Sequence, residues 1–183
     1  MTGQLKSAVH GQTLVLTLSN PALRNALGPE IYAAGIEALN AAESNPDIRS
    51  VIITGEGAHF CAGGNLQRLQ ANRQEAKEVQ AQSIDGLHTW MEAIHTFPKP
   101  VIAAVEGAAA GAGFSLALMC DLVVAARDSI FVMAYSSIAL SPDGGGSWNL
   151  SRVLPRQLAA ELMLLGERIS AERLHALGSV NRL

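Results

Sequence analysis

Short apolar runs of β-forming residues alternate along the chain with longer segments in which apolar residues recur every three or four positions. The short runs predict strands, and the three-to-four spacing predicts amphipathic helices. The predicted strands occupy residues 13–19, 50–57, 100–107, 122–126 and 130–134. The predicted helices, of which the second segment forms one helix or two, occupy residues 30–44, 66–97, 113–121, 157–166 and 170–178. Strands that alternate with helices indicate an α/β protein.

Two turns built from small residues follow apolar strands in this pattern. The first is FCAGGN, residues 60–65, and the second lies within GAAAGAG, residues 107–113, which leads into a helix that is apolar nearly all round. Glycine lets backbone approach a ligand closely, and N–H groups at a helix start are unpaired and favour negative charge. Two such turns side by side would offer two donors to a carbonyl oxygen that becomes an oxyanion. Tight packing is the alternative interpretation of either turn alone.

Composition and charge narrow the classes of function. The 183 residues suffice for one domain with a substantial core, and 49% of them are hydrophobic against 16% charged. A net charge of −3 without a block of lysine and arginine disfavours nucleic acid as a partner. The first residues lack the apolar core of a signal peptide, and no apolar run reaches the roughly 20 residues of a membrane span. The only cysteines, Cys61 and Cys120, fit a reduced cytoplasmic protein without a disulfide framework or a zinc site.

A dinucleotide-binding turn is the competing interpretation of the second turn. Residues 101–128 run as strand, Gly-x-Gly, helix and strand, and they end on an acidic residue. However, Leu116 takes the place of the third glycine, and the Gly-x-Gly begins several residues after the strand. Both departures disfavour a Rossmann site.

Five stretches carry a family resemblance, and they follow one another in order from about residue 13 to residue 183. They read NPALRNAL, FCAGGNL, KPVIAAVEGAAAGAGFSLALMCDLVVAA, SPDGGGSWNLSRVLP and LGERISAERLHALGSVNRL. Together they resemble the crotonase superfamily, also called the enoyl-CoA hydratase/isomerase family. The resemblance implies an α/β fold of the crotonase type, a spiral of repeated β-β-α units, in a single core domain of residues 1–183. Because relatives continue for several helices beyond GSVNRL, it also implies that a C-terminal helical trimerisation segment is missing here.

The resemblance further implies acyl-CoA substrates, no cofactor beyond the CoA of the substrate, and a homotrimer or a dimer of trimers. It assigns both turns to one oxyanion hole, in which the backbone N–H groups of Gly64 and Ala112 hold the thioester oxygen. Arg24 matches a basic position near the CoA phosphate or adenine, with a solvated loop arginine as the alternative, and Ala62 matches a backbone contact to CoA. The other residues placed at the substrate are Gly63, Asn65 (which also supports the turn), Gly111 and Ser115.

The sequence departs from the hydratases of this family at both of their glutamates. Ser115 stands at the first position and Tyr135 at the second. A two-carboxylate mechanism needs an acid and a base, and neither serine nor tyrosine substitutes well for a carboxylate. Tyr135 instead either donates a hydrogen bond to substrate or narrows the pocket. Asp143 matches an aspartate that other members use as a proton shuttle or as a nucleophile, although an aspartate before glycines also forms turns.

His88 falls where the dehalogenase type of this family has its histidine. It shares a helical face with Ile84, Met91 and His95, which could turn it toward the site, and a packed core histidine is the alternative.

The predicted activity is a double-bond or ring isomerisation of an enoyl-CoA, with Asp143 as the single acid and base. The loop SPDGGGSW most resembles members that act on aromatic-degradation intermediates. Two alternatives stay open. One is hydration or hydrolysis with Asp143 activating water, and the other is a non-catalytic acyl-CoA-binding subunit.

Overall fold

Strands of the computed structural model, which describes residues 3–183, form two sheets. The strands are β1 (Gln4–His10), β2 (Thr13–Ser19), β3 (Ser50–Gly55), β4 (Val101–Val105), β5 (Ala108–Ala110), β6 (Leu122–Ala125), β7 (Ile130–Val132) and β8 (Arg168–Ser170). The larger sheet has the order β1-β2-β3-β4-β6, with β1 antiparallel and the other neighbours parallel. The smaller sheet has the order β5-β7-β8, with β8 antiparallel. The first two residues of the predicted domain lie outside the described part of the chain.

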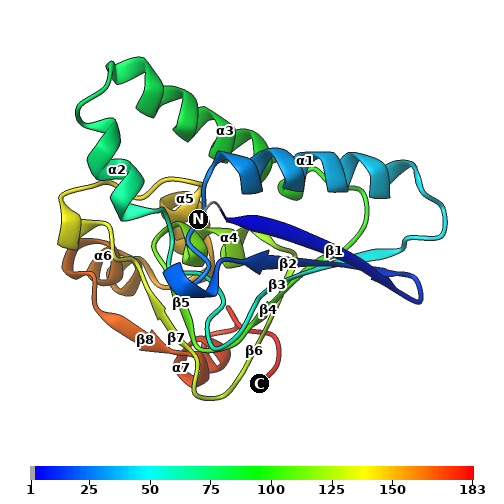
Figure 1. Ribbon diagram of the computed structural model, residues 1–183. Coiled ribbons are helices and arrows are strands. Elements are labelled where there is room, and N and C mark those ends of the chain that lie inside the picture. The colour runs from blue at the N-terminus through cyan, green and yellow to red at the C-terminus, as the bar shows by residue number, and fades with distance from the viewer. Residues whose placement is uncertain (1–2) are drawn as a thin grey trace.

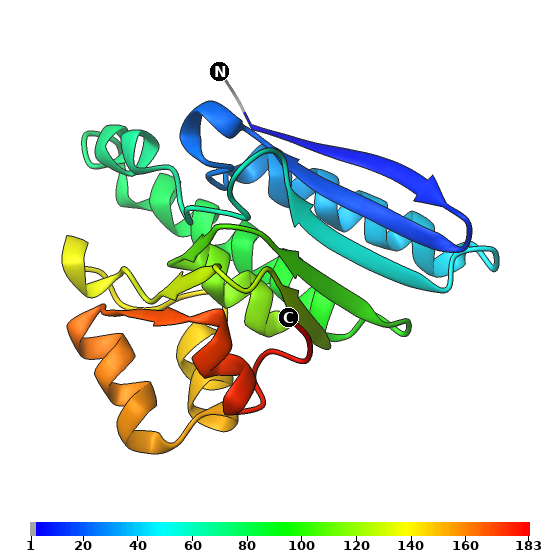
Figure 2. The same ribbon diagram turned by 90° about the horizontal axis from the view of Figure 1, so that it is seen from below.

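Some helices cover one side of the larger sheet, and others gather beside the smaller sheet. They are α1 (Pro29–Ser44), α2 (Leu66–Asn72), α3 (Lys77–His95), α4 (Ala112–Met119), α5 (Gly146–Val153), α6 (Arg156–Leu165) and α7 (Ala171–Ala176), with 3-10 turns η1 (Pro21–Leu23) and η2 (Ser136–Ile138). Helices α1 and α3 pack against each other along the larger sheet (Figure 1). Helices α6 and α7 lie beside β8 at the opposite end (Figure 2).

The alternation of side chains along the parallel strands explains why the larger sheet has a buried face. Successive side chains of a strand point to opposite faces, so every second residue enters the core. The strand register places Leu16, Ile53, Ala103 and Val123 in one row across four strands. All four are buried, and this row forms part of the main hydrophobic core.

A repeated β-β-α path links the two sheets. After β4 the chain enters the smaller sheet as β5 and then forms α4, and after β6 it enters the smaller sheet as β7 before it reaches α5. A shorter version follows β3, where Cys61 forms an isolated parallel bridge with Ala109 of β5 before α2 begins. The predicted α/β spiral of β-β-α units is thus confirmed.

The segment 66–97 forms two helices, one of the two predicted possibilities, because residues 73–76 interrupt the helix between α2 and α3. The structure differs from the predicted elements in that strands β1, β5 and β8 were not predicted. Strand β1 is almost entirely exposed, so it lacks the apolar alternation that would have predicted it. Helix α5 begins at Gly146, inside the segment predicted as a glycine-rich loop. Over residues 3–183, no helix combines the length and the apolar character that crossing a bilayer requires.

Candidate active site

The two small-residue turns meet in the structure. The N–H of Cys61 donates to Ala108 O at 3.1 Å, and the N–H of Ala110 donates to Cys61 O at 2.9 Å. Gly63 has φ +91, and a Cβ atom there would lie 2.7 Å from Ala110 O and 3.2 Å from Ala112 N. The first turn therefore touches the start of α4, and only glycine fits at the point of contact.

The contact brings two free backbone donors together. Within residues 3–183, the N–H groups of Gly64 and Ala112 donate no hydrogen bond. Ala112 opens α4, where the first N–H groups have no partner inside the helix and the helix dipole is positive. The preceding Gly111 has φ +51 and donates its own N–H to Val132 O at 2.9 Å, which fixes the turn to β7. This arrangement can hold a carbonyl oxygen and stabilise negative charge on it.

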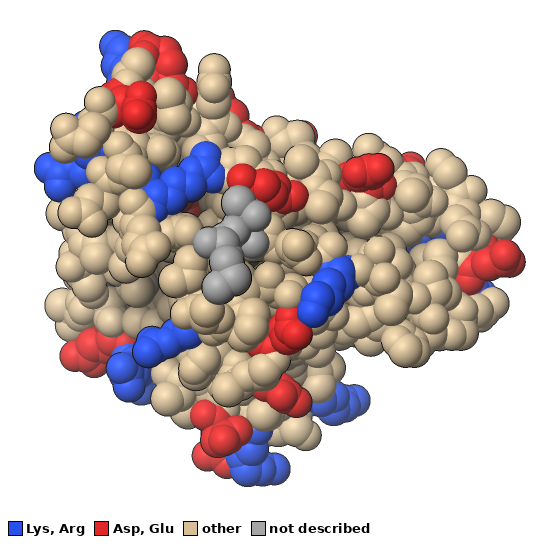
Figure 3. Space-filling view, in the orientation of Figure 1, with Lys and Arg blue, Asp and Glu red and all other residues tan. Residues whose placement is uncertain are grey.

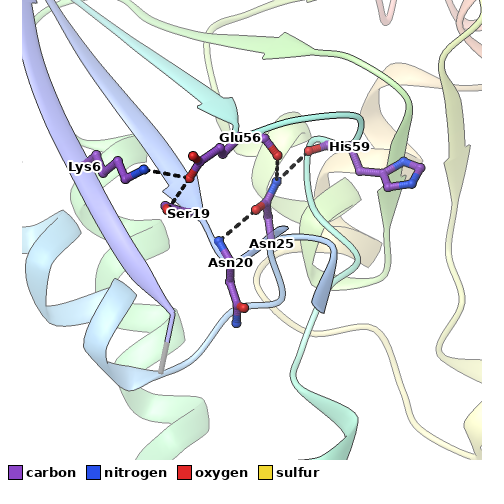
Figure 4. Close-up of polar contacts among 6 residues, drawn as sticks. All are labelled: Lys6, Ser19, Asn20, Asn25, Glu56 and His59. Atoms are coloured by element: carbon purple, nitrogen blue, oxygen red, sulfur yellow. Dashed lines mark hydrogen bonds and ion pairs between the residues drawn. The ribbon is translucent and has the colours of Figure 1, made fainter. Parts of the chain in front are cut away.

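A buried asparagine holds the loop that leads to the first turn, as Figure 4 shows. The Asn25 amide donates to Glu56 O at 2.9 Å and to His59 O at 2.7 Å, and its oxygen accepts the N–H of Asn20 at 2.9 Å. Asn25 is fully buried and has φ +57, a left-handed conformation that asparagine tolerates better than most residues. Sequence reasoning missed this role of Asn25, which stands between Arg24 and Ala26 in NPALRNAL.

Polar contacts at the surface continue this network. The Glu56 carboxylate accepts hydrogen bonds from Lys6 Nζ at 2.9 Å and from the Ser19 hydroxyl (Figure 4). These two bonds lower the pKa of the Glu56 carboxyl, with the Lys6 bond as the larger cause. At the far end of the turn, the Asn65 side chain accepts the N–H of Arg68 at 3.2 Å and caps α2. The predicted support of the turn by Asn65 is thus visible as a helix cap.

Ser115, Tyr135 and Asp143 form a hydrogen-bonded cluster. Tyr135 donates its O–H to Asp143 Oδ1 at 2.7 Å, and the Ser115 Oγ lies 3.1 Å from the Tyr135 oxygen. Ser115 is fully buried and Tyr135 is 5% exposed, while Asp143 is partly exposed. Burial is the main cause that raises the pKa of the Tyr135 phenol, and the negative charge of Asp143 raises it further. The phenol therefore stays protonated and donates to the carboxylate.

A second tyrosine belongs to this region and was missed by sequence reasoning. Tyr32 lies on the buried face of α1, against Trp90 with ring centroids 6.1 Å apart. Burial raises the pKa of its phenol most, and the next cause is the charge of Asp143. The Asp143 carboxylate thus acts on both tyrosines of the chain.

His88 is not a packed core histidine, and its catalytic role stays a prediction. Its side chain is exposed, whereas Leu87, Trp90 and Met91 are buried. His88 follows Leu87 by one residue, which is about 100° around a helix, and this rotation carries it off the buried face. It lines an open groove of about 370 Å³ between α3 and the start of α5.

A second pocket lies beside the two turns, with a volume of about 340 Å³. It brings together the predicted Arg24 and Ala62 with His59, Arg168 and Asp128. The two arginines outnumber the one acid, so this pocket favours an anionic ligand. Elsewhere, on the face seen in Figure 3, acidic and basic side chains are interspersed.

Neither cysteine can act as a nucleophile at this site. Cys61 and Cys120 are both buried, and burial raises the pKa of the Cys61 thiol to about 12. Burial likewise raises the pKa of Cys120. A buried thiol that stays protonated is inert. Among the side chains of residues 3–183, no three of His, Cys, Asp or Glu lie where they could share a metal ion.

Fold and site together define an α/β protein of β-β-α repeats in which paired backbone donors lie beside a hydrogen-bonded carboxylate. The family described as Enoyl-CoA hydratase/isomerase matches residues 9–183, and the chain belongs to this family. The resemblance found in the sequence is thereby confirmed.

Individual relatives point to more than one reaction. The chain is 39% identical to the 1,2-epoxyphenylacetyl-CoA isomerase of Escherichia coli K12, over 95% of this chain and 67% of that protein. It is 35% identical to the 2,3-dehydroadipyl-CoA hydratase of the same organism, over 93% of this chain and 65% of that protein. A crystal structure described as an enoyl-CoA hydratase from Polaromonas sp. JS666 is 76% identical, with a TM-score of 0.97 over 99% of this chain and 70% of that one. The chain thus spans about two thirds of the length of these curated relatives.

Proposed function

We propose that this chain carries the active site of an acyl-CoA isomerase, which moves a double bond or rearranges a ring in an enoyl-CoA. The observation that carries the proposal is the cluster of Ser115, Tyr135 and Asp143. The positions that match the two glutamates of hydratases hold hydroxyl groups, and these are hydrogen-bonded to each other and to one carboxylate. A single carboxylate can take a proton from one carbon and return it to another, whereas hydration needs an acid and a base.

The proposed mechanism uses the free donors and the carboxylate in turn. The thioester oxygen accepts hydrogen bonds from the N–H groups of Gly64 and Ala112, which acidifies the α or γ hydrogen of the acyl group. Asp143 takes that proton, and the electron pair of the C–H bond is delocalised into an enolate that the two donors stabilise. Asp143 then returns the proton to a different carbon. Substrate and product have the same atoms, and no cofactor beyond the CoA of the substrate takes part.

The anion-favouring pocket supports a CoA thioester as the substrate. CoA carries phosphate groups, and arginine binds phosphate through several N–H donors at once. Arg24 and Arg168 line this pocket with Ala62, which lies two residues before the donor Gly64. The nucleotide end would thus lie beside the turn whose backbone holds the thioester. The homotrimer or dimer of trimers stays a prediction from the resemblance, and the cytoplasmic location stays a prediction from the two cysteines.

Hydration is the second candidate, because a relative that is 35% identical is named as a hydratase. In this alternative Asp143 activates a water molecule that adds to the double bond. A non-catalytic acyl-CoA-binding subunit is the third candidate.

The test is to incubate the purified chain with crotonyl-CoA and with an unsaturated phenylacetyl-type CoA in deuterated water, and to follow products by mass spectrometry. We expect deuterium incorporation without gain of water. Asp143→Asn should slow incorporation by about 10²- to 10⁴-fold, the usual contribution of a general acid or base. The matched control is Asp47→Asn, which removes an exposed carboxylate in the loop after α1, on the other side of the molecule from α5 (Figure 1).

Each other outcome identifies an alternative. A water adduct that Asp143→Asn abolishes indicates a hydratase. Saturable CoA-ester binding without any deuterium incorporation indicates the non-catalytic subunit. Full activity in Asp143→Asn contradicts both enzymatic mechanisms.

A further inference from the structure

The hydrogen bonds of the cluster formed by Ser115, Tyr135 and Asp143 all run in one direction. The Tyr135 oxygen carries a single proton, and that proton is donated to Asp143 Oδ1. The 3.1 Å contact with Ser115 must then run the other way, with the Ser115 hydroxyl donating to the Tyr135 oxygen. The order is Ser115 to Tyr135 to Asp143, so that every proton points toward the carboxylate.

Packing holds the two hydroxyl residues rigidly. Ser115 lies on α4, is fully buried, and is crowded by the backbone of Gly146, where any Cβ atom would overlap the Ser115 oxygen. The Tyr135 ring tip lies next to Gly111, where a Cβ atom would be 3.9 Å from the Tyr135 Cζ. Gly111 immediately precedes the donor Ala112. The phenol is therefore fixed between the oxyanion turn and the loop that carries the carboxylate.

The Asp143 loop itself has little to orient its carboxylate. Gly144 and Gly145 follow with φ +55 and +76, and the N–H of Gly146 donates to Asp143 O at 2.9 Å. This bond constrains the main chain and does not involve the carboxylate. The bond from Tyr135 is the side-chain contact that determines where the carboxylate points.

We propose that Tyr135 is the positioning residue of Asp143: it holds Oδ1 by its O–H so that the other carboxylate oxygen faces the reacting carbon, and Ser115 orients the phenol. This inference rests on the proposed function, in which Asp143 moves the proton. Tyr135 neither takes nor gives the proton itself. Its hydrogen bond is made to the carboxylate, the form that acts as a base.

Other ionisable groups surround the carboxylate. Tyr32 of α1 faces the same charge, and Arg68, Glu30 and Cys61 act in turn on Tyr32. Cys61 and both tyrosines stay protonated near neutral pH, because burial raises the pKa of each.

The test compares Tyr135→Phe, Ser115→Ala and Asp143→Asn by deuterium incorporation into the same CoA ester. Tyr135→Phe should lower kcat by about 10- to 100-fold, the usual effect of a lost hydrogen bond to a charged group, with KM changed by less than about twofold. Ser115→Ala should lower kcat by about threefold, as expected for a neutral hydrogen bond. Wild-type kcat in Tyr135→Phe, beside an inactive Asp143→Asn, would overturn the inference and leave the proposed function intact. Full activity in Asp143→Asn would overturn both.

A second measurement does not depend on activity or on the folding of Tyr135→Phe. The chain has two tyrosines, so 3-fluorotyrosine incorporated into Tyr32→Phe labels Tyr135 alone. Its fluorine resonance should move when Asp143→Asn is added to the same chain, because the substitution removes the charged acceptor of its hydrogen bond. A resonance that Asp143→Asn leaves in place would show that the phenol does not hold this carboxylate.

Discussion

The two sides of the site are built from different parts of the chain. The donor side consists of backbone N–H groups at Gly64 and Ala112, and its geometry depends on small residues that let two turns touch. The acid side consists of the side chains of Ser115, Tyr135 and Asp143, which are joined by hydrogen bonds. Substitution at 115 or 135 can therefore change the chemistry while the donor side stays intact.

The largest expected effect comes from separating the two turns with one methyl group. A Cβ atom at Gly113 would overlap the carbonyl oxygen of Cys61 and lie 2.9 Å from its Sγ atom. Because that oxygen belongs to the backbone of the first turn, Gly113→Ala should push the donors apart. We expect a loss of 10²-fold or more in turnover, the cost of losing about one oxyanion donor, measured as deuterium incorporation.

The control is a glycine with room for a methyl group. Gly86 lies within α3, and an added Cβ would meet only Tyr32 Cδ2 at 3.5 Å, an ordinary contact. Gly86→Ala should keep its turnover and its melting temperature. Equal turnover in Gly113→Ala and Gly86→Ala would contradict the convergence of the turns.

The next largest expected effect is a loss of stability, caused by a substitution on the donor side alone. Asn25→Ala removes three hydrogen bonds and leaves the carbonyls of Glu56 and His59 and the N–H of Asn20 without their partner. A buried group left unpaired costs about 1–3 kcal/mol, so we expect the free energy of unfolding to fall by about 3 kcal/mol or more. Denaturation by urea measures this free energy of unfolding.

An exposed part of the same network provides the comparison. Lys6→Met breaks the ion pair between Lys6 and Glu56. The Lys6 side chain is 54% exposed and the Glu56 side chain is 38% exposed. Pairs of this kind contribute at most about 1 kcal/mol, so this variant should unfold close to the wild type. A similar loss in both variants would mean that Asn25 is no more important than a surface charge.

The arginine pocket should affect binding and leave the chemistry unchanged. Arg24→Gln and Arg168→Gln each remove a cation from the pocket beside the turns. An exposed ionic contact contributes about 1 kcal/mol, so KM for the CoA ester should rise about fivefold with kcat nearly constant. Arg127→Gln is the matched control, since Arg127 is paired with Glu172 on the surface. A drop in kcat without a change in KM would place these arginines at the chemistry instead.

The sequence predicted two small-residue turns after apolar strands, FCAGGN and GAAAGAG, because glycine and alanine mark such turns directly. The choice of Gly64 and Ala112 as donors came from the family resemblance. The acid side could be predicted only in part. The residue types at 115, 135 and 143 were evident, but their hydrogen bonds depend on how α4 and the loop before α5 pack.

The residues that sequence reasoning missed interact with residues far away in the chain. Tyr32 shares a region with Asp143 although more than one hundred positions lie between them. His88 had two alternatives, turned toward the site or packed in the core, because it shares a helical face with Ile84 and Met91. Trp90 and Leu87 define the buried face instead, and that choice depends on what α1 presents to α3.

The smallest expected effect concerns the two tyrosines and tests the acid side by its charge. Burial raises the pKa of both phenols, and Asp143 raises it further, so the native chain should show no tyrosinate absorbance where exposed tyrosines titrate, at about pH 10. The unfolded chain loses these protons from about pH 10 while the native chain keeps them. Stability is thus fully present below about pH 10 and falls as the pH rises, by up to about 1.4 kcal/mol per pH unit for each tyrosine.

Asp143→Asn removes the charge and leaves the burial. The onset of tyrosinate absorbance should therefore move to lower pH in this variant, by less than burial itself moves it, because burial is the larger cause for both residues. Spectrophotometric titration near 295 nm follows the two phenols together, and Tyr32→Phe in the same background isolates Tyr135. An onset that is unchanged by Asp143→Asn would mean that the carboxylate does not face the phenols, and the acid side would then lack the contact that distinguishes it from the donor side.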